Sequence, residues 1–328
     1  MAEQKYICSG SKLTALGNAI REKAKTADKY TLDQMAAAIN NLASMEKLGE
    51  GDTFVAFYAD SDLKTKLDCK QAADSIINGS RIYAYYMNPS ESKFATCTDD
   101  ELEATIAAHY EGSIDLTQVW SVGDTRKITL PAMAGVRANH VEQDVEIVLM
   151  HAKPSWIETG KNNGIPAFVW GLKDGLKAGD PMNTSGYNRG GWTSSEGRRW
   201  CNTTFLESLP SGIKNSTKQV MNICADTGGN SAIKTIVNDY CFLVAEKEVF
   251  GVSTNAADTI ESKIMQLDWY KTVKNRIKHL GIDGKANVWW MRSPYSNNGV
   301  SFCMVQAGGY SDYNNANYNI MFSPHGCF

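Results

Sequence analysis

The stretch Trp289-Trp290-Met291-Arg292-Ser293-Pro294 places two adjacent indoles before an arginine and a proline. Neighbouring side chains of a β-strand point to opposite faces of the sheet, so at least one of the two tryptophans must point into a core. The residue before a proline favours extended backbone, which predicts an extended exit into a loop. The stretch therefore predicts a buried strand that forms a rigid frame for the segment after it.

The next 25 residues, Tyr295 to Asn319, have the opposite character. They contain six Asn, four Tyr, three Ser and one Asp, and no Lys, Arg, Glu or Trp. Turn-rich loops would explain the Asn, Ser and Asp but not the persistent Tyr, and low-complexity disorder does not suit a segment enclosed between Trp-Trp and the closing Phe322 to Phe328. Tyr with Asn, Ser and Gly is the composition of antibody-combining sites, which indicates a binding surface.

Codon chemistry favours the same interpretation. Random replacement of the adenines in an Asn codon yields Asn, Tyr, Ser, Asp, His, Gly, Thr, Ile and similar residues, but it cannot yield Lys, Glu, Gln, Met, Trp or a stop codon. The segment fits this set except at Met304 and Gln306. A variable surface written by adenine substitution would have this composition.

The overall composition is that of an ordinary globular protein able to bury a core, with 43% hydrophobic and 21% charged residues in 328. A net charge of −3 argues against nucleic acid as the main partner. No apolar run is long enough to cross a membrane, and the start lacks the apolar segment of a secretory signal. The eight scattered cysteines include no CxxC pair and are expected to be reduced, mostly buried thiols.

The patterns along the chain indicate three regions. Residues 1–46 predict a helical hairpin for attachment or oligomerisation, and residues 47–97 predict a small linker module with strands near 53–58 and 81–86. Residues 98–328 predict an α+β domain with short strands and long loops, which opens with a helix capped by Thr98 and Glu101. Within it we expect strands at 126–130 and 145–149, an amphipathic helix at about 260–280, and a solvated turn at 246–248.

No catalytic motif stands out. The five histidines show no metal-ligand spacing, and there is no GxSxG, Walker or GxGxxG motif. Cys303 and Cys327 could form a redox pair, although two small buried hydrophobic residues are the simpler interpretation. Arg198 and Arg199 could bind a carboxylate, but arginines that pack across Trp192 and Trp200 inside a loop-rich core are favoured.

The ordered pieces of residues 119–328 resemble the C-type-lectin-fold variable proteins of diversity-generating retroelements, in the subgroup related to formylglycine-generating enzymes. The pieces that carry the resemblance are Val119-Trp120-Ser121-Val122-Gly123-Asp124, Asp144 to His151, Gly190-Gly191-Trp192, Arg198-Arg199-Trp200, Glu248-Val249-Phe250-Gly251, Trp289 to Pro294, and Ser323-Pro324 before Cys327. In addition, Leu13 to Lys23 and Tyr30 to Met35 are similar to helical segments of tail proteins from phages of Gram-positive gut bacteria.

The resemblance implies a C-type-lectin-like C-terminal domain with a variable region at about 289–323. It implies a structural frame of Gly191, Trp192, Arg198, Trp200, Trp289, Trp290 and Arg292. The ligand-binding positions that it implies are Tyr295, Ser296, Asn297, Asn298, Ser301, Tyr310, Ser311, Asp312, Tyr313, Asn314, Asn315, Asn317, Tyr318 and Asn319. No cluster of acidic residues and Asn matches a lectin calcium site, so neither a metal nor a cofactor is expected.

The function that the resemblance implies is non-enzymatic receptor binding at a phage tail, with a host cell-surface protein or glycan as ligand. The N-terminal hairpin would dock to tail proteins or form a homo-oligomer, and the chain would reside in the virion or, before assembly, in the bacterial cytoplasm. Two alternatives stay open. One is a bacterial surface adhesin or carbohydrate-binding module, and the other is a formylglycine-generating-type oxidase that uses Cys303 and Cys327.

Overall fold

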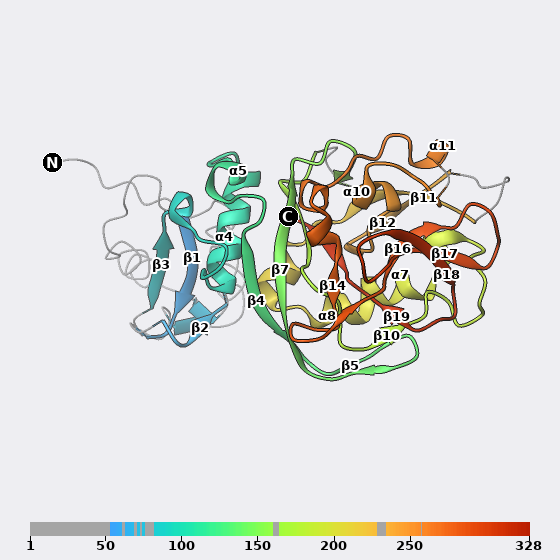
Figure 1. The fold of residues 1–328 in the computed structure, drawn as a ribbon. Helices are drawn as coiled ribbons and strands as arrows, with labels where there is room; N and C mark the ends of the chain where they lie inside the picture. Colours follow the sequence, from blue (N-terminus) through green and yellow to red (C-terminus); the bar gives the residue numbers. More distant parts are fainter. Residues whose placement is uncertain are drawn as a thin grey trace, which may run out of the picture. The chain divides into compact units, whose positions relative to one another are not determined.

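A computed structural model of the chain describes residues 53–60, 63–68, 71–72, 74–75, 82–159, 164–227, 234–256 and 258–328. The described residues form two compact units (Figure 1). The first runs to Ser92 and includes Cys97–Val119, and the second comprises Lys93–Thr96 and Trp120–Phe328. The helical hairpin predicted for residues 1–46 lies outside the described residues.

The first unit is a small sheet covered by a helix. Its elements are β1 (Thr53–Tyr58), β2 (Lys66–Leu67), β3 (Tyr83–Met87), the 3-10 turn η1 (Pro89–Glu91), α4 (Asp99–Tyr110) and α5 (Leu116–Val119). The antiparallel sheet has the order β2-β1-β3. Its strands β1 and β3 correspond to the two strands predicted near 53–58 and 81–86. Thr98 and Glu101 form the predicted capping box of α4, and Gly112 follows the helix with a φ of 79°.

Helix α4 belongs to this first unit, whereas the sequence pattern predicted that the lectin-like domain begins at residue 98. Ala104 of the helix packs into one core with Val55 and Tyr58 of β1, and the Tyr58 hydroxyl donates to Asp100 at 3.0 Å. Burial next to two carboxylates raises the pKa of Tyr58 to about 12, which keeps the hydroxyl protonated as a donor. The boundary therefore moves to residue 119, because the helix uses its apolar face on β1.

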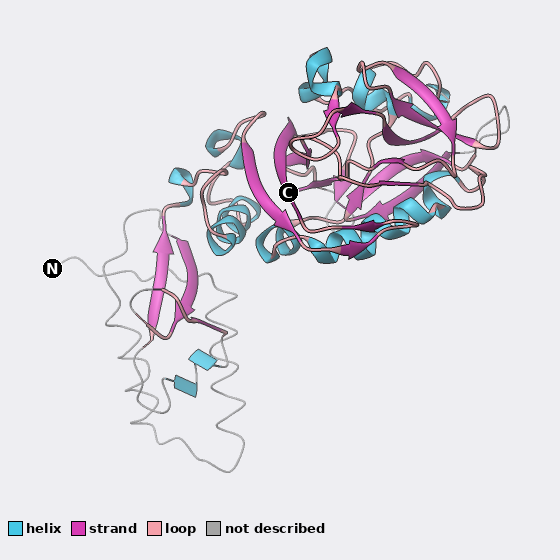
Figure 2. Cartoon of the chain, turned by 60° about the horizontal axis from the view of Figure 1, so that its bottom comes forward, coloured by secondary structure: helices cyan, strands magenta, loops and turns pink. Residues whose placement is uncertain are grey.

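The second unit is dominated by strands, and its helices are short (Figure 2). One five-stranded sheet has the order β13 (Cys241–Phe242), β20 (His325–Cys327), β9 (Phe168–Leu172), β7 (Gln143–Ala152) and β4 (Thr125–Leu130). The other has the order β10 (Gly179–Asp180), β19 (Ile320–Met321), β16 (Trp289–Pro294), β17 (Ser301–Val305) and β18 (Ser311–Asn315). The two predicted strands at 126–130 and 145–149 are confirmed as β4 and β7.

Smaller elements complete the unit. A three-stranded sheet has the order β12 (Lys234–Asp239), β11 (Val220–Ala225) and β8 (Glu158–Thr159), and two-stranded ribbons pair β5 (Met133–Ala134) with β6 (Asn139–His140) and β14 (Lys278–His279) with β15 (Ala286–Asn287). The helical elements are α6 (Gly191–Ser194), α7 (Glu196–Trp200), the π-helical turn η2 (Cys201–Phe205), α8 (Leu206–Ser208), α9 (Ser211–Ser216), α10 (Glu246–Phe250), α11 (Asp258–Glu261), η3 (Asp268–Lys271) and η4 (Val273–Arg276). The predicted α+β class is confirmed.

Strand β16 shows why the stretch at Trp289 is so apolar. It lies inside its sheet between β19 and β17, and all six of its residues are buried. Both indoles are completely covered, so the prediction of at least one inward tryptophan holds for both. A strand that is covered on two faces has a continuous run of large side chains rather than an alternating one.

The helix predicted for residues 260–280 is wrong. The segment contains the single turn α11, the 3-10 turns η3 and η4, and the strand β14. Tyr270 is fully buried, stacks on Trp289 with ring centroids 5.8 Å apart, and shares a hydrogen bond of 2.9 Å with the His325 ring. These long-range contacts require short turns, and they override the helical spacing of the apolar residues.

The six cysteines in the described part of the chain are free and buried, as predicted for reduced thiols. Over that same part, none of the helices has the length and apolar character needed to cross a bilayer.

Gly191 is the position where the backbone most clearly excludes a side chain. Its φ is 53°, and a Cβ atom would lie 1.8 Å from the carbonyl oxygen of Ala225. We expect Gly191→Ala to lower the free energy of unfolding by more than about 3 kcal/mol, because backbone atoms must move. Gly123→Ala is the matched control: its φ is 98°, but its nearest contact is 3.9 Å away.

In the control, the free energy of unfolding should fall by only roughly 1–2 kcal/mol, which is the cost of a side chain at a positive φ. Urea unfolding monitored by tryptophan fluorescence measures both variants. Equal losses would mean that the close approach to Ala225 carries no cost beyond the positive φ.

Candidate functional site

The predicted variable positions lie along β17, β18 and the connections around them, at one edge of their sheet (Figure 1). Strands β17 and β18 are antiparallel, with Ser301 opposite Asn315 and Val305 opposite Ser311. The connections 295–300 and 316–319 therefore meet at one end of the hairpin. The turn 306–310, which contains Tyr310, lies at the other end, roughly 13 Å away at the usual rise per residue.

The tyrosines of this region are the most exposed of its large side chains. Tyr310, Tyr318 and Tyr313 expose 70%, 54% and 40% of their surface. Tyr295 stacks face to face on Tyr313, with ring centroids 3.6 Å apart and planes 7° apart. Asn297, Asn315, Asn317 and Asn319 are also exposed. We call the exposed and half-buried predicted positions together the variable surface.

Not every predicted position belongs to the variable surface. Ser301 is buried and its hydroxyl donates to Asn315 at 3.2 Å, so its prediction as a ligand contact is corrected. Ser296, Asn298, Ser311, Asp312 and Asn314 are half-buried. Within this group, Ser311 donates to the Glu246 carboxylate and accepts from Asn255 at 2.8 Å, while Asn298 accepts from the backbone of Val300 and Ser301.

The variable surface is supported by a loop that the sequence patterns did not single out. Asn188 is buried, and its side-chain amide donates to the carbonyls of Asn298 at 2.9 Å and Ser301 at 2.7 Å. The backbone amide of Asn183 donates to the carbonyl of Ala316 at 3.0 Å. The run Asn183-Thr184-Ser185-Gly186-Tyr187-Asn188 uses the same residue types as the variable segment, which is the signal that could have identified it.

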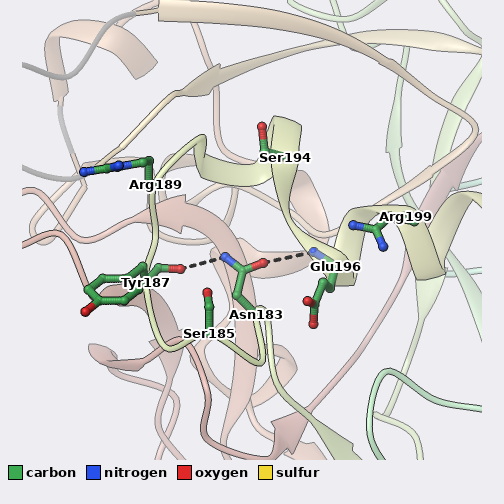
Figure 3. Close-up of a pocket in the computed structure, with 7 residues that line it drawn as sticks. All are labelled: Asn183, Ser185, Tyr187, Arg189, Ser194, Glu196 and Arg199. Carbon is green, nitrogen blue, oxygen red and sulfur yellow. Dashed lines mark hydrogen bonds between the residues drawn. The ribbon is translucent and has the colours of Figure 1, made fainter.

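The same loop forms one wall of a cavity of about 570 Å³ (Figure 3). Seven residues line it, namely Asn183, Ser185, Tyr187, Arg189, Ser194, Glu196 and Arg199. The Asn183 side-chain amide donates to the Tyr187 carbonyl at 2.7 Å, and its side-chain oxygen accepts from the Glu196 backbone at 3.0 Å. A second cavity of about 300 Å³ shares Ser194 and Arg199 with the first.

The frame residues of helices α6 and α7 meet at one buried carboxylate. Asp239 accepts from the Trp192 indole at 2.8 Å and from Asn222 at 3.0 Å on one oxygen. Its other oxygen accepts from Arg198 at 2.6 Å and from Asn202 at 3.1 Å. Arg198 is therefore a structural residue, in agreement with the favoured interpretation, whereas Arg199 is exposed.

The remaining frame residues tie distant segments together. The indoles of Trp200, Trp289 and Trp290 donate to the carbonyls of Ala134, Arg276 and Asp180 at 2.7, 2.9 and 2.9 Å. Arg292 is buried and pairs with Glu248 at 2.6 Å, and it also donates to the Leu243 carbonyl at 2.8 Å. Each of these four buried side chains has a polar partner, which a rigid interior requires.

The solvated turn expected at 246–248 is wrong for both glutamates. Glu246 and Glu248 are completely buried. Glu246 accepts from the backbone amides of Asn255 at 2.9 Å and Ala256 at 2.7 Å, and Glu248 pairs with Arg292. The alternating charges of the sequence suggested solvent exposure, but these contacts come from segments that local patterns do not place nearby.

The two cysteines of the enzymatic alternative lie in different sheets, Cys303 in β17 and Cys327 in β20. Burial raises the pKa of both thiols well above the usual range. A raised pKa disfavours the thiolate, which is the reactive form of cysteine. Among the described residues, no group of three or more His, Cys, Asp or Glu side chains is arranged to hold a metal ion.

Glu261 lies close to Glu246, and its titration makes the stability of the fold depend on pH. Burial raises its pKa to about 7, against the opposing effects of the Ser293 hydroxyl and Arg292. A raised carboxyl pKa means that this group stabilises the fold fully below pH 4.5, and that this contribution is lost as the pH rises through about 7.

We therefore expect Glu261→Gln to flatten the stability profile. As the pH rises from about 4.5 to about 8, the free energy of unfolding of the variant should increase by about 3 kcal/mol relative to that of the wild type, from the size of the pKa shift. Urea unfolding at a series of pH values measures the difference. Glu142→Gln, at an exposed carboxylate, is the control and should run parallel to the wild type. Parallel profiles for Glu261→Gln as well would contradict the assignment.

Comparison with known proteins adds one match. The sequence model of a family described as a domain of unknown function (DUF6273) matches residues 172–321, a range that contains the 183–189 loop, the Asp239 network and strands β16 to β18. A search among curated proteins and a search among solved structures each find no match. The matched range thus contains the frame residues and the whole variable surface, and the match brings no activity with it.

Proposed function

We propose that this chain is a non-enzymatic receptor-binding protein whose C-terminal domain, of the C-type-lectin type, presents the variable surface to a host cell-surface protein or glycan. The observation that carries the proposal is the set of exposed tyrosines on a fixed frame. Tyr310, Tyr313 and Tyr318 project from an edge hairpin whose inner strand is completely buried.

Tyrosine is suited to this role because it offers a large amphipathic contact with only two side-chain torsions to fix. The stacking of Tyr295 on Tyr313 already restrains both rings before a ligand arrives. Pre-organisation of this kind lowers the entropy cost of binding. The neighbouring Asn and Ser side chains supply hydrogen-bonding groups that can adapt to different partners.

The support beneath the variable surface favours diversification. Asn188, Asn183 and Arg137 hold the backbone carbonyls of Asn298, Ala316 and Asn317. These three supporting residues lie outside the predicted variable region 289–323. Side chains at exposed positions could therefore change while the loop backbone keeps its partners, which is the requirement for a surface rewritten by adenine substitution.

Placement at a phage tail is part of the proposal, with the helical hairpin that the sequence predicts for residues 1–46 as the attachment. Several copies on one particle would raise the apparent affinity of a modest single site. The oxidase alternative receives less support, because the raised pKa of Cys303 and Cys327 disfavours the thiolate. The adhesin alternative shares the same surface and differs in where the chain is displayed.

Replacing Tyr310, Tyr313 and Tyr318 together by alanine should weaken binding to host cells at least about tenfold, because interface tyrosines often contribute more than about 1.4 kcal/mol each. The measurement is flow cytometry of the fluorescently labelled chain on a panel of Gram-positive gut bacteria. The melting temperature should change by only a few degrees, since exposed substitutions cost little stability.

Tyr240→Ala is the matched control, because Tyr240 exposes 39% of its surface and lies outside the variable surface. It should bind as the wild type does. Unchanged binding of the triple variant, or an equal loss in the control, would contradict the proposal. Loss of the fold in the triple variant would assign these rings to the core.

The diversification can be tested on DNA. We expect a near-copy of the segment that encodes Trp289 to Ser323 close to the gene, differing from it only where the copy carries adenine, together with a reverse-transcriptase gene. Sequencing of the flanking DNA provides the answer. Absence of both would leave the tyrosine-rich segment as a polar loop of fixed specificity and would return the adhesin alternative to equal standing.

A further inference from the structure

The cavity of about 570 Å³ beside the variable surface is lined by residues outside the variable region 289–323. Its volume lies within the range of small-molecule sites. The loop that forms it also holds the variable surface, through Asn188 on one side and Asn183 on the other. One part of a ligand in the cavity would therefore contact residues outside the variable region, while another part of the same ligand could reach the variable surface.

Two arginines in the cavity wall are not used by the fold. Arg189 and Arg199 are exposed, and neither guanidinium has an ion pair or a hydrogen bond within the described part of the chain. The adjacent Arg198 is different, because Asp239 and the carbonyls of Thr193 and Asn238 occupy its nitrogens. Unused guanidinium groups in a concave site suit an anionic ligand, which they can bind in a bidentate manner.

Acceptor groups in the same cavity are fixed in place. The Glu196 carboxylate accepts from the backbone amide of Thr184 at 3.0 Å and from its hydroxyl at 2.9 Å. Asn183 is held between the Tyr187 carbonyl and the Glu196 amide (Figure 3). An immobilised carboxylate in a cavity that Ser185 and Ser194 also line is suited to ligand hydroxyl groups rather than to a bare anion.

An aromatic ring completes the set. Tyr187 lines the cavity and exposes 61% of its surface, although its backbone is tied to Asn183. An exposed ring at a polar cavity offers an apolar face against which a flat, weakly polar ligand face can pack. Groups that bind an anion, hydroxyls and an apolar face together describe a site for a sugar ring that carries a negative charge.

We propose that this cavity is a binding site for an anionic sugar residue. Arg199 binds its acidic group and Glu196 accepts its hydroxyls, whereas Tyr187 and Arg189, on the other side of the cavity, contact the continuation of the ligand (Figure 3). The site deepens the receptor-binding function proposed above and rests on it for its biological role. The second cavity of about 300 Å³, which shares Ser194 and Arg199, leaves room for the next residue of an oligosaccharide.

The experiment is calorimetric titration of the full chain, backed by saturation-transfer NMR, with four sugars. Glucuronic acid and N-acetylneuraminic acid carry carboxylates, glucose 6-phosphate carries a phosphate, and glucose is neutral. We expect millimolar or tighter binding of at least one acidic sugar and at least about tenfold weaker binding of glucose, because hydrogen bonds to charged groups are the strong ones. The two kinds of acidic sugar distinguish carboxylate from phosphate recognition.

The variants isolate the arginines. Arg199→Gln should weaken binding of the acidic sugar about tenfold or more, and Arg199→Lys should lose less because it keeps the charge without the planar fork. Arg189→Gln, on the other side of the cavity, should weaken binding of a single sugar less than Arg199→Gln does. Lys285→Gln, at another exposed cation of the same unit, is the control and should bind normally. All substituted side chains are exposed, so the melting temperatures should stay close to that of the wild type.

The outcome separates the two proposals. Failure of every acidic sugar to bind at concentrations up to about 20 mM, or equal binding of glucose, overturns the cavity proposal and leaves the tyrosine surface untouched. Binding that survives unchanged in Arg199→Gln overturns it too. If the triple tyrosine variant still binds the acidic sugar while cell binding never depends on Tyr310, Tyr313 or Tyr318, the receptor-binding proposal fails and the sugar site stands.

Discussion

The buried carboxylate of Asp239 is the constraint on which the rest of the second unit depends. It accepts four hydrogen bonds from side chains on β11, α6, α7 and η2, one of them an ion pair with Arg198, so this buried charge is stabilised by donors from the stretch 192–202 and from Asn222. A buried charge-assisted network of this kind destabilises the fold when any of its hydrogen bonds is missing. Its completeness fixes the helices that carry Trp192 and Arg198, and with them the loop that precedes them.

That loop connects the frame to the surface. Asn188 reaches from it to the backbone of Asn298 and Ser301, and Asn183 reaches the backbone after β18. Because these hydrogen bonds go to main-chain carbonyls, they do not depend on which side chains the supported residues carry. For this reason an exposed surface of Tyr and Asn can sit on a rigid base, and the same loop can offer a cavity of constant composition beside it.

Buried charge also lies beneath the hairpin itself. Glu246 holds the 255–256 turn and receives the Ser311 hydroxyl, while Glu248 pairs with Arg292 on β16. Glu261, with a pKa of about 7, completes this acidic layer. These contacts make the underside of the variable surface polar, specific and sensitive to pH, whereas its outer side carries the exposed rings.

The sequence by itself determined the features that depend on neighbours along the chain. These were the α+β class, the capped helix after Thr98, the strands near 126–130 and 145–149, and the buried strand that begins at Trp289, because capping, alternation and long apolar runs are local signals. Only the tertiary structure decided which polar side chains are covered. Ser311 meets Glu246 across 65 residues and Asn188 meets Ser301 across 113, and no local pattern reports a partner so far away. The same reason explains the failed helix at 260–280, because Tyr270 stacks on Trp289 and bonds to His325, contacts that form only when distant segments fold together.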